Sequence, residues 1–189
     1  MTIVLPQLSN EQLFQLCEMN PDLRIERTAG GEIIIMPPTG GETGNRSAAV
    51  ITQLTFWSWE DGTGVTFDSS TGFDLPDGAT RSPDAAWVRK SRLKDLAEEQ
   101  KEKFLPLCPD FVVEIRSPSD SLSALKDKMQ EYLDNGAELG WLIDTRQQKV
   151  FIYRPHRPVE ELDKPPKLSG EPLLPDFTLD LDKVWEPNF

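Results

Sequence analysis

Short apolar runs and alternating apolar and polar residues recur along this chain, and both patterns predict β-strands. The run PDFVVEIR, residues 109–116, is the clearest example. Side chains alternate across a strand, so one face of this run is wholly apolar, whereas Val112, Glu114 and Arg116 share the other face. An acid and a base on a strand that enters a core require an explanation. One explanation is a same-face ion pair on a half-exposed strand, and the other is a pair that points into a cleft.

Other segments have the spacing of helices. Ser9 followed by Gln12 is a capping box, and Pro21 ends the first helix. Asn45 is expected near the N-cap of a second helix, and Gly136 is the stop signal of a later one. The expected helical segments are 8–21, 45–60, 121–137 and, on the surface, 90–104.

The remaining apolar runs predict further strands. These are 23–27 and 32–37, joined by a hairpin turn, two short strands within 64–78, residues 82–88, and a strand, turn and strand within 139–155. This order of elements predicts an α/β fold with a mixed central β-sheet flanked by helices.

We expect a single domain over residues 1–189. Its parts are an N-terminal helix and hairpin (1–38), a core (39–155) and a Pro-rich C-terminal extension (156–189). The extension is expected to wrap the surface, and its segment 177–185 either returns to the sheet or packs as a cap.

Charge limits the partners that the chain can bind. Its 20 basic and 32 acidic residues give a net charge of −12, which repels nucleic acid unless a local basic patch exists. Residues 81–94 carry five basic residues against one acid, a local charge of +4. This segment is either a nucleic-acid contact or a solvated linker at the end of a strand.

The remaining composition excludes several classes of protein. Two cysteines and one histidine are too few for a zinc site of the usual spacing, and Cys17 and Cys108 are expected to be buried free thiols. The chain has no signal-peptide pattern and no apolar run long enough to span a bilayer, which predicts a cytoplasmic location without a membrane partner. Trp57, Trp87 and Trp141 lie on apolar periodicities and are expected in the core.

Two of the expected strands begin with Pro-Asp and then become apolar. If they are neighbours, Asp84 and Glu114 converge, and two close carboxylates repel each other unless a cation joins them. Oxygen ligands without Cys or His suit Mg²⁺ or Mn²⁺, which can activate water for phosphodiester cleavage. Arg116 would then hold a phosphate oxygen. Alternatively, Asp84 is a turn aspartate that follows a proline.

The segments SPDAAWV, PDFVVEIRSPSD and LKDKMQEYLDNGAELGWLID together resemble the Uma family of candidate restriction endonucleases, within the PD-(D/E)XK nuclease superfamily. The similarity extends from about Pro37 to Tyr153, and weakly into residues 168–179. It implies a restriction-endonuclease-like fold. The three-residue superfamily motif is weak alone, whereas the order and spacing of all three segments are specific to the family.

The resemblance implies roles for individual residues. Asp84 and Glu114 match the two motif acids, which bind metal, with the Ile115 carbonyl as a further ligand. Arg116 stands where the superfamily has lysine, and since arginine does not lose its proton, it can only stabilise phosphate charge. Lys128 matches a lysine of the following helix.

Two further residues complete this set of candidates. Glu42 is a candidate metal ligand, because related enzymes often place an acid near the corresponding helix. Lys126 lies on the opposite edge of the apolar stripe from Lys128 and is the alternative amine.

The main hypothesis is therefore a Mg²⁺- or Mn²⁺-dependent endonuclease that hydrolyses phosphodiester bonds, with DNA as its expected partner. The alternative is a catalytically inactive module of nuclease fold that binds nucleic acid or a protein. The net charge and Arg116 favour this second hypothesis. A third is a domain that acts only within a larger assembly. The chain is also expected to form a homodimer, although nothing in the sequence indicates the interface.

Overall fold

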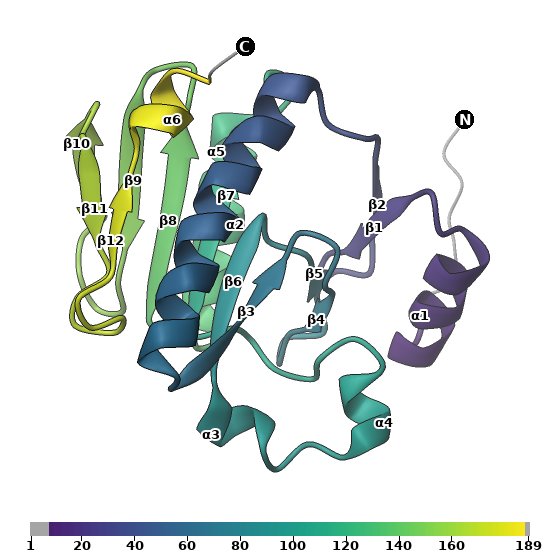
Figure 1. Ribbon diagram of the computed structural model, residues 1–189. Coiled ribbons are helices and arrows are strands. Elements are labelled where there is room, and N and C mark those ends of the chain that lie inside the picture. Colours follow the sequence, from purple (N-terminus) through teal and green to yellow (C-terminus); the bar gives the residue numbers. More distant parts are fainter. Residues whose placement is uncertain (1–7, 188–189) are drawn as a thin grey trace.

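A six-stranded sheet with helices on both faces forms the centre of the computed structural model, which describes residues 8–187 (Figure 1). Its strands follow the order β10-β9-β8-β7-β6-β3. Strands β7 and β8 run parallel, and the other neighbours are antiparallel. The mixed central sheet flanked by helices that the sequence predicts is confirmed.

The central strands are short and mostly buried. They are β3 (Gly64–Asp68), β6 (Ala85–Arg89), β7 (Phe111–Ile115), β8 (Leu139–Asp144), β9 (Lys149–Tyr153) and β10 (Glu160–Asp163). A second sheet has the order β2-β1-β5-β4. Its strands are β1 (Arg24–Arg27), β2 (Ile33–Met36), β4 (Phe73–Asp74) and β5 (Thr80–Arg81). Strands β11 (Lys167–Ser169) and β12 (Thr178–Asp180) form a separate pair.

Each face of the central sheet has its own apolar core. Val113 and Trp141 face helix α2 (Gly41–Asp61), whereas Val112 and Leu142 face helix α5 (Leu122–Asp134). The alternation of side chains along each strand produces these two layers. Trp87 and Trp141 are core residues, as predicted, and Trp57 is partly buried against the same core.

Local signals predict the ends of most helices. Helix α1 (Asn10–Met19) has Ser9 and Gln12 in the predicted capping box. Helix α5 has Ser121 as its N-cap and ends before Gly136, whose φ of 107° is a conformation that favours glycine. Helix α2 begins at Gly41, four residues before the predicted Asn45. Backbone hydrogen bonds extend it through glycines, which have poor helix propensity.

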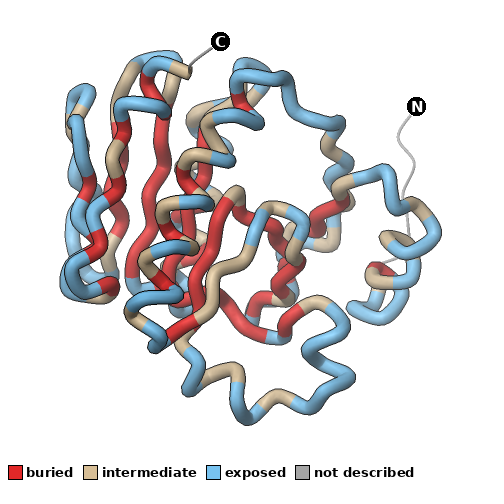
Figure 2. The backbone as a smooth tube through the Cα atoms, viewed as in Figure 1, coloured by how far each residue is buried: buried red, intermediate tan, exposed pale blue. Residues whose placement is uncertain are grey.

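The C-terminal extension does more than wrap the surface. Leu168, Phe177, Leu179 and Val184 are buried against the α2 face of the sheet, and the helix α6 (Asp182–Trp185) follows them. Figure 2 shows buried positions within this extension. The expectation that residues 155–175 wrap the surface is therefore wrong at Leu168 and Leu174, whose side chains complete the core. Of the two alternatives for 177–185, the structure shows packing as a cap, because β12 pairs with β11 and not with the central sheet.

Two other segments differ from prediction. The charged segment 90–104 forms two single-turn helices, α3 (Lys90–Leu93) and α4 (Glu98–Lys101), in place of one long helix. The two short strands predicted within 64–78 exist, but β3 pairs with β6 and β4 pairs with β5. Among residues 8–187, none of the helices combines the length and apolar character needed to cross a membrane.

Candidate functional site

The antiparallel pairing of β6 and β7 brings Asp84 and Glu114 together. Ala85 pairs with Val113, so extending the register by one residue places Asp84 opposite Glu114. Asp84 Oδ2 accepts a hydrogen bond of 2.8 Å from the backbone N–H of Ile115. The expected convergence of the two acids is therefore present in the geometry, while their catalytic and metal-binding roles stay predictions.

Both acids line one cavity of about 600 Å³. Its walls come from the loop before α2, the first turn of α2, the loop after β7, and α5. Its charged lining residues are Arg24, Glu42, Arg46, Asp84, Glu114, Asp120 and Lys128. Chain segments far apart in the sequence thus gather acidic and basic groups around a common space.

Glu114 occupies the most enclosed position in this set. It is 4% exposed, and its Oε1 accepts a hydrogen bond of 3.0 Å from the hydroxyl of Tyr132. Lys128 Nζ lies 2.8 Å from the same oxygen. Burial raises the pKa of Glu114 to about 7; the negative charges of Asp84 and Glu26 add to this rise, and Lys128 partly offsets it. The carboxyl group therefore exchanges its proton near neutral pH.

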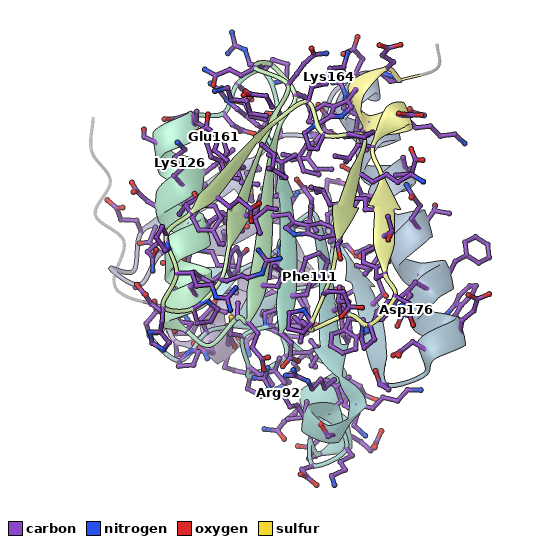
Figure 3. All side chains as sticks on the ribbon, turned by 90° about the vertical axis from the view of Figure 1, so that its left-hand side faces the viewer. Arg92, Phe111, Lys126, Glu161, Lys164 and Asp176 are labelled. Atoms are coloured by element: carbon purple, nitrogen blue, oxygen red, sulfur yellow. The ribbon has the colours of Figure 1, made fainter. Side chains whose placement is uncertain are left out.

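Lys128 lies between two carboxylates. Its Nζ is 2.9 Å from Glu26 Oε1 and 2.8 Å from Glu114 Oε1. Burial lowers the pKa of Lys128, but the two carboxylates outweigh burial and raise the pKa above its usual value, so the amine stays charged. Lys126 instead lies over the ring of Phe151 on β9, at 3.9 Å from the ring centroid (Figure 3). Lys128 is thus the amine that enters the cavity.

Glu26 is a member of this cluster that the sequence interpretation missed. Burial raises its pKa, but the ion pair with Lys128, the N–H of Ser82 and the charge of Arg81 together lower it. Its oxygens lie 3.0 Å from Ser82 N and 3.2 Å from Arg81 Nη1. The pattern LRIER in β1 carried a signal, because Arg24 and Glu26 share one face of a strand.

Arg24 is a second cation that the sequence interpretation missed. Its Nη1 lies 3.4 Å from Asp84 Oδ1, and its Nη2 donates to the carbonyl of Ser82. The buried Nε of Arg24 has no hydrogen-bond partner among residues 8–187. Because this guanidinium lines the cavity, its positive charge can contribute to binding an anion there.

Arg116 does not line the cavity, which corrects the expectation that it shares a cleft with Glu114. Strand β7 ends at Ile115, so the alternation of side chains does not continue to Arg116. Its Nη1 pairs with Asp144 at 2.8 Å, and its Nε donates to the carbonyl of Asp120 at 3.2 Å. The fully buried carboxylate of Asp144 holds this guanidinium away from the predicted site.

Glu42 lies at the edge of the cavity, in the first turn of α2. Its side chain is 65% exposed and pairs with Arg46 at 3.1 Å. An acidic side chain is favoured at a helix N-terminus, which accounts for this position without a bound ligand. Glu42 thus lines the same cavity as Asp84 and Glu114, and its role as a metal ligand stays a prediction.

The basic segment 81–94 commits three of its five basic residues to ion pairs within the fold, while Lys90 and Lys94 are exposed. Arg81 pairs with Glu131 and Glu26. Arg89 pairs with Asp110 at 2.6 Å, and Arg92 reaches the same acid at 3.1 Å. Structural ion pairs therefore use much of the positive charge that the sequence placed there.

The donor set is compatible with a small hard cation. No group of three or more His, Cys, Asp or Glu side chains within residues 8–187 is placed to hold a metal ion. Mg²⁺, however, usually binds one or two carboxylates and completes its shell with water and substrate phosphate. Asp84 and Glu114 provide two hard oxygen ligands, and Ile115 lies beside them at the cavity.

Comparison with known proteins agrees with this geometry. Residues 10–182 match the model of the Uma2 family, described as "Putative restriction endonuclease". A crystal structure from Anabaena variabilis, described as a putative nuclease belonging to DUF820, superposes with a TM-score of 0.77 at 23% identity, covering 94% of this chain and 97% of that one. This likeness shows a shared fold. A search of the curated proteins finds no match.

Proposed function

Since the chain belongs to the Uma2 family of candidate restriction endonucleases, we propose that it is an endonuclease that hydrolyses phosphodiester bonds in DNA with the help of Mg²⁺ or Mn²⁺. One observation carries the proposal: Asp84 and Glu114, thirty positions apart in the sequence, line the same cavity together with the charged amine of Lys128. Acids and a cation around one space are what phosphodiester hydrolysis requires.

Asp84 and Glu114 would hold the metal, with Ile115 and Glu42 as further candidates at the same cavity. When bound, such an ion lowers the pKa of water and neutralises charge on the phosphate. Because burial raises the pKa of Glu114 to about 7, Glu114 becomes ionised for this task as the pH rises through neutrality. The backbone N–H of Ile115 donates a hydrogen bond of 2.8 Å to Asp84 Oδ2 and so orients the Asp84 carboxylate.

Lys128 and Arg24 would stabilise the negative charge that develops on the phosphate. Lys128 stays protonated because Glu26 and Glu114 flank it, so it acts as a fixed positive charge and does not accept a proton. Arg24 is anchored by Asp84 and the Ser82 carbonyl, and its guanidinium lines the cavity beside the proposed metal ligands. Arg24 thereby takes the place in the proposal that the sequence interpretation gave to Arg116.

The test is cleavage of supercoiled plasmid DNA by the purified chain with Mg²⁺, with Mn²⁺ and with a chelator. We expect nicked and linear products that depend on metal and disappear in Glu114→Gln. Glu98→Gln is the matched control, since Glu98 is 86% exposed and pairs with Lys101 away from the cavity. Equal products from wild type and Glu114→Gln would contradict the proposal, because they would come from a contaminant.

A non-catalytic module is the second candidate, and one observation favours it. Glu114 Oε1 already contacts Tyr132 and Lys128, while Asp84 contacts Ile115 and Arg24, so the ion pairs satisfy both acids without metal. Calorimetry with Mn²⁺ separates the two functions. A binding heat that Asp84→Asn abolishes supports the endonuclease, and the absence of heat in the wild type supports the module.

A further inference from the structure

The outer face of α2 carries two large aromatic side chains in contact with solvent. Phe56 is 61% exposed and Trp59 is 73% exposed, and their rings form an edge-to-face pair with centroids 5.7 Å apart. Both lie in the second half of the helix, on the side away from buried Leu54 and Ser58. A soluble protein seldom exposes paired aromatics without a binding function.

The first half of the same helix borders a hollow of about 660 Å³. Its helical lining includes the small residues Ala48, Ala49 and Thr52, and its far wall includes Asp182 and Lys183 of α6. At 100° per residue, the positions 48, 49, 52, 56 and 59 fall within about one third of the helix circumference. The hollow and the aromatic pair therefore lie along one face of one helix.

We propose that this face binds a second copy of the chain, with the two α2 helices packed antiparallel about a two-fold axis. Such an axis near residue 53 places Phe56 and Trp59 of each copy over the small residues of the partner copy's helix. In a parallel pair of helices, the aromatic half of one copy would face the aromatic half of the other. In an antiparallel pair, the aromatic half of each copy faces the hollow beside the other, so only this orientation is self-complementary. Two-fold self-complementary interfaces are the commonest in homo-oligomers.

The area is sufficient for a weak dimer. Each aromatic side chain can bury roughly 150–250 Å², so four of them and the surfaces they cover give about 1,000 Å² or more. That area is at the lower end of specific interfaces, where weak and transient complexes are found, and we expect the dimer to dissociate at micromolar concentrations. Glu60 follows Trp59 in α2. In the proposed packing, Glu60 of one copy approaches the hollow of the other copy, which Lys183 of α6 lines. Asp182 borders the same hollow, so this charge attraction is secondary to apolar contact.

The proposed dimer also determines where the two candidate sites lie. Glu42 and Thr43, in the first turn of α2, line the cavity that holds Asp84 and Glu114. Antiparallel packing places these turns at opposite ends of the helix pair. A helix of 21 residues is about 30 Å long, so the two cavities lie at least about that far apart. The association itself does not depend on the proposed nuclease function.

The test is sedimentation velocity of the full chain from low to high micromolar concentration. We expect a monomer–dimer equilibrium that Trp59→Lys weakens by about 30-fold or more, as for a central aromatic of an interface. Ala48→Trp, which fills the hollow and leaves the aromatic pair unchanged, should weaken it similarly. Circular dichroism melts of each variant check that the fold is retained, since both positions are exposed.

Ile35→Lys is the matched control, because Ile35 is 58% exposed on the edge strand β2, the other apolar surface that could pair two copies. It should leave the dissociation constant unchanged. Lys183→Glu should weaken the dimer modestly, and combination with Glu60→Lys should restore it. A monomer at every concentration, a dimer insensitive to Trp59→Lys or Ala48→Trp, or a dimer that only Ile35→Lys disrupts would each overturn the proposal.

Discussion

Two Pro-Asp pairs in this chain have opposite surroundings. Asp84 precedes β6 and Asp110 precedes β7, so the local sequences are alike. Because β6 and β7 are antiparallel, their first residues lie at opposite ends of the sheet. Asp84 therefore meets the end of β7 and lines the cavity with Glu114. Asp110 lies at the other end and pairs with Arg92, which Figure 3 labels together with Phe111, the first residue of β7.

The cations around the two acids differ in the same way. Asp110 is 1% exposed and is matched by two guanidinium groups and by the backbone N–H of Arg89. At the cavity, Asp84 pairs with one guanidinium, that of Arg24, at 3.4 Å, and the single amine of Lys128 is divided between Glu26 and Glu114. A buried acid with its own cations stabilises the fold, and buried acids that share a cation keep an affinity for further positive charge.

The largest expected effect is a difference in DNA cleavage between variants of Asp84 and Asp110, at the two ends of the β6–β7 pair. Asp84→Asn should lower metal-dependent DNA cleavage by about 10²–10³-fold, because a carboxylate of the proposed site is lost. Asp110→Asn should change the rate by no more than a few-fold at a temperature where the variant is folded. Initial rates of plasmid nicking measure both. Equal losses in the two variants would show that the ends do not differ in function.

The second effect reverses the order of the two variants. Asp110→Asn should lower the free energy of unfolding by about 3 kcal/mol, because it leaves Arg89 and Arg92 without their buried acid; the partial exposure of both arginines limits the loss. Asp84→Asn should cost less than that, since it relieves repulsion with Glu114. Urea denaturation of both variants measures this. A larger loss for Asp84→Asn would refute the structural role of Asp110.

The third effect concerns the pH dependence of stability of the metal-free protein. Glu114 keeps its proton up to about pH 7 when folded and loses it near 4.5 when unfolded. The folded chain thus binds more protons in this window, so stability falls as pH rises through it, by about 3 kcal/mol. The pKa of Lys128 is raised, so this group affects stability only above the window. The pKa of Glu26 is lowered, so this group affects stability only below the window.

Glu114→Gln provides the reference for that measurement, because glutamine does not titrate. The difference in unfolding free energy between wild type and Glu114→Gln should decline from pH 4.5 to 7 and then level off. A difference that stays constant over this range would mean that burial does not hold the proton on Glu114.

The smallest expected effect is on metal affinity, and it tests whether Glu26 and Glu114 share the positive charge of Lys128. Glu26→Gln should weaken Mn²⁺ binding about tenfold, because the amine of Lys128 then pairs with Glu114 alone and competes with the ion there. Calorimetry measures the affinity. Glu131→Gln is the control, since Glu131 pairs with Arg81 outside the cavity and should leave the affinity unchanged. Unchanged affinity in Glu26→Gln would exclude this role, whereas no binding by the wild type would exclude the metal site itself.

Local signals in the sequence predicted a large part of the fold. The capping box at Ser9, the glycine stop at Gly136 and the apolar runs of β7, β8 and β9 depend on neighbours within a few residues, so they can be read from the chain. Two cavity acids, Asp84 and Glu114, also followed from strand alternation and from the family resemblance. The sequence placed the start of α2 at Asn45 and not at Gly41, because glycine has poor helix propensity and the residues before Asn45 are rich in glycine.

The tertiary structure alone decided which charges meet. Glu26 and Arg24 come from a hairpin about sixty residues before β6, and no local pattern links them to Lys128 or Asp84. Arg116 lies two residues after Glu114, yet the strand ends between them and Asp144 on the neighbouring strand captures its guanidinium. Alternation and capping act along the chain, whereas ion pairing depends on strand order and register, and these are set by how the whole core packs.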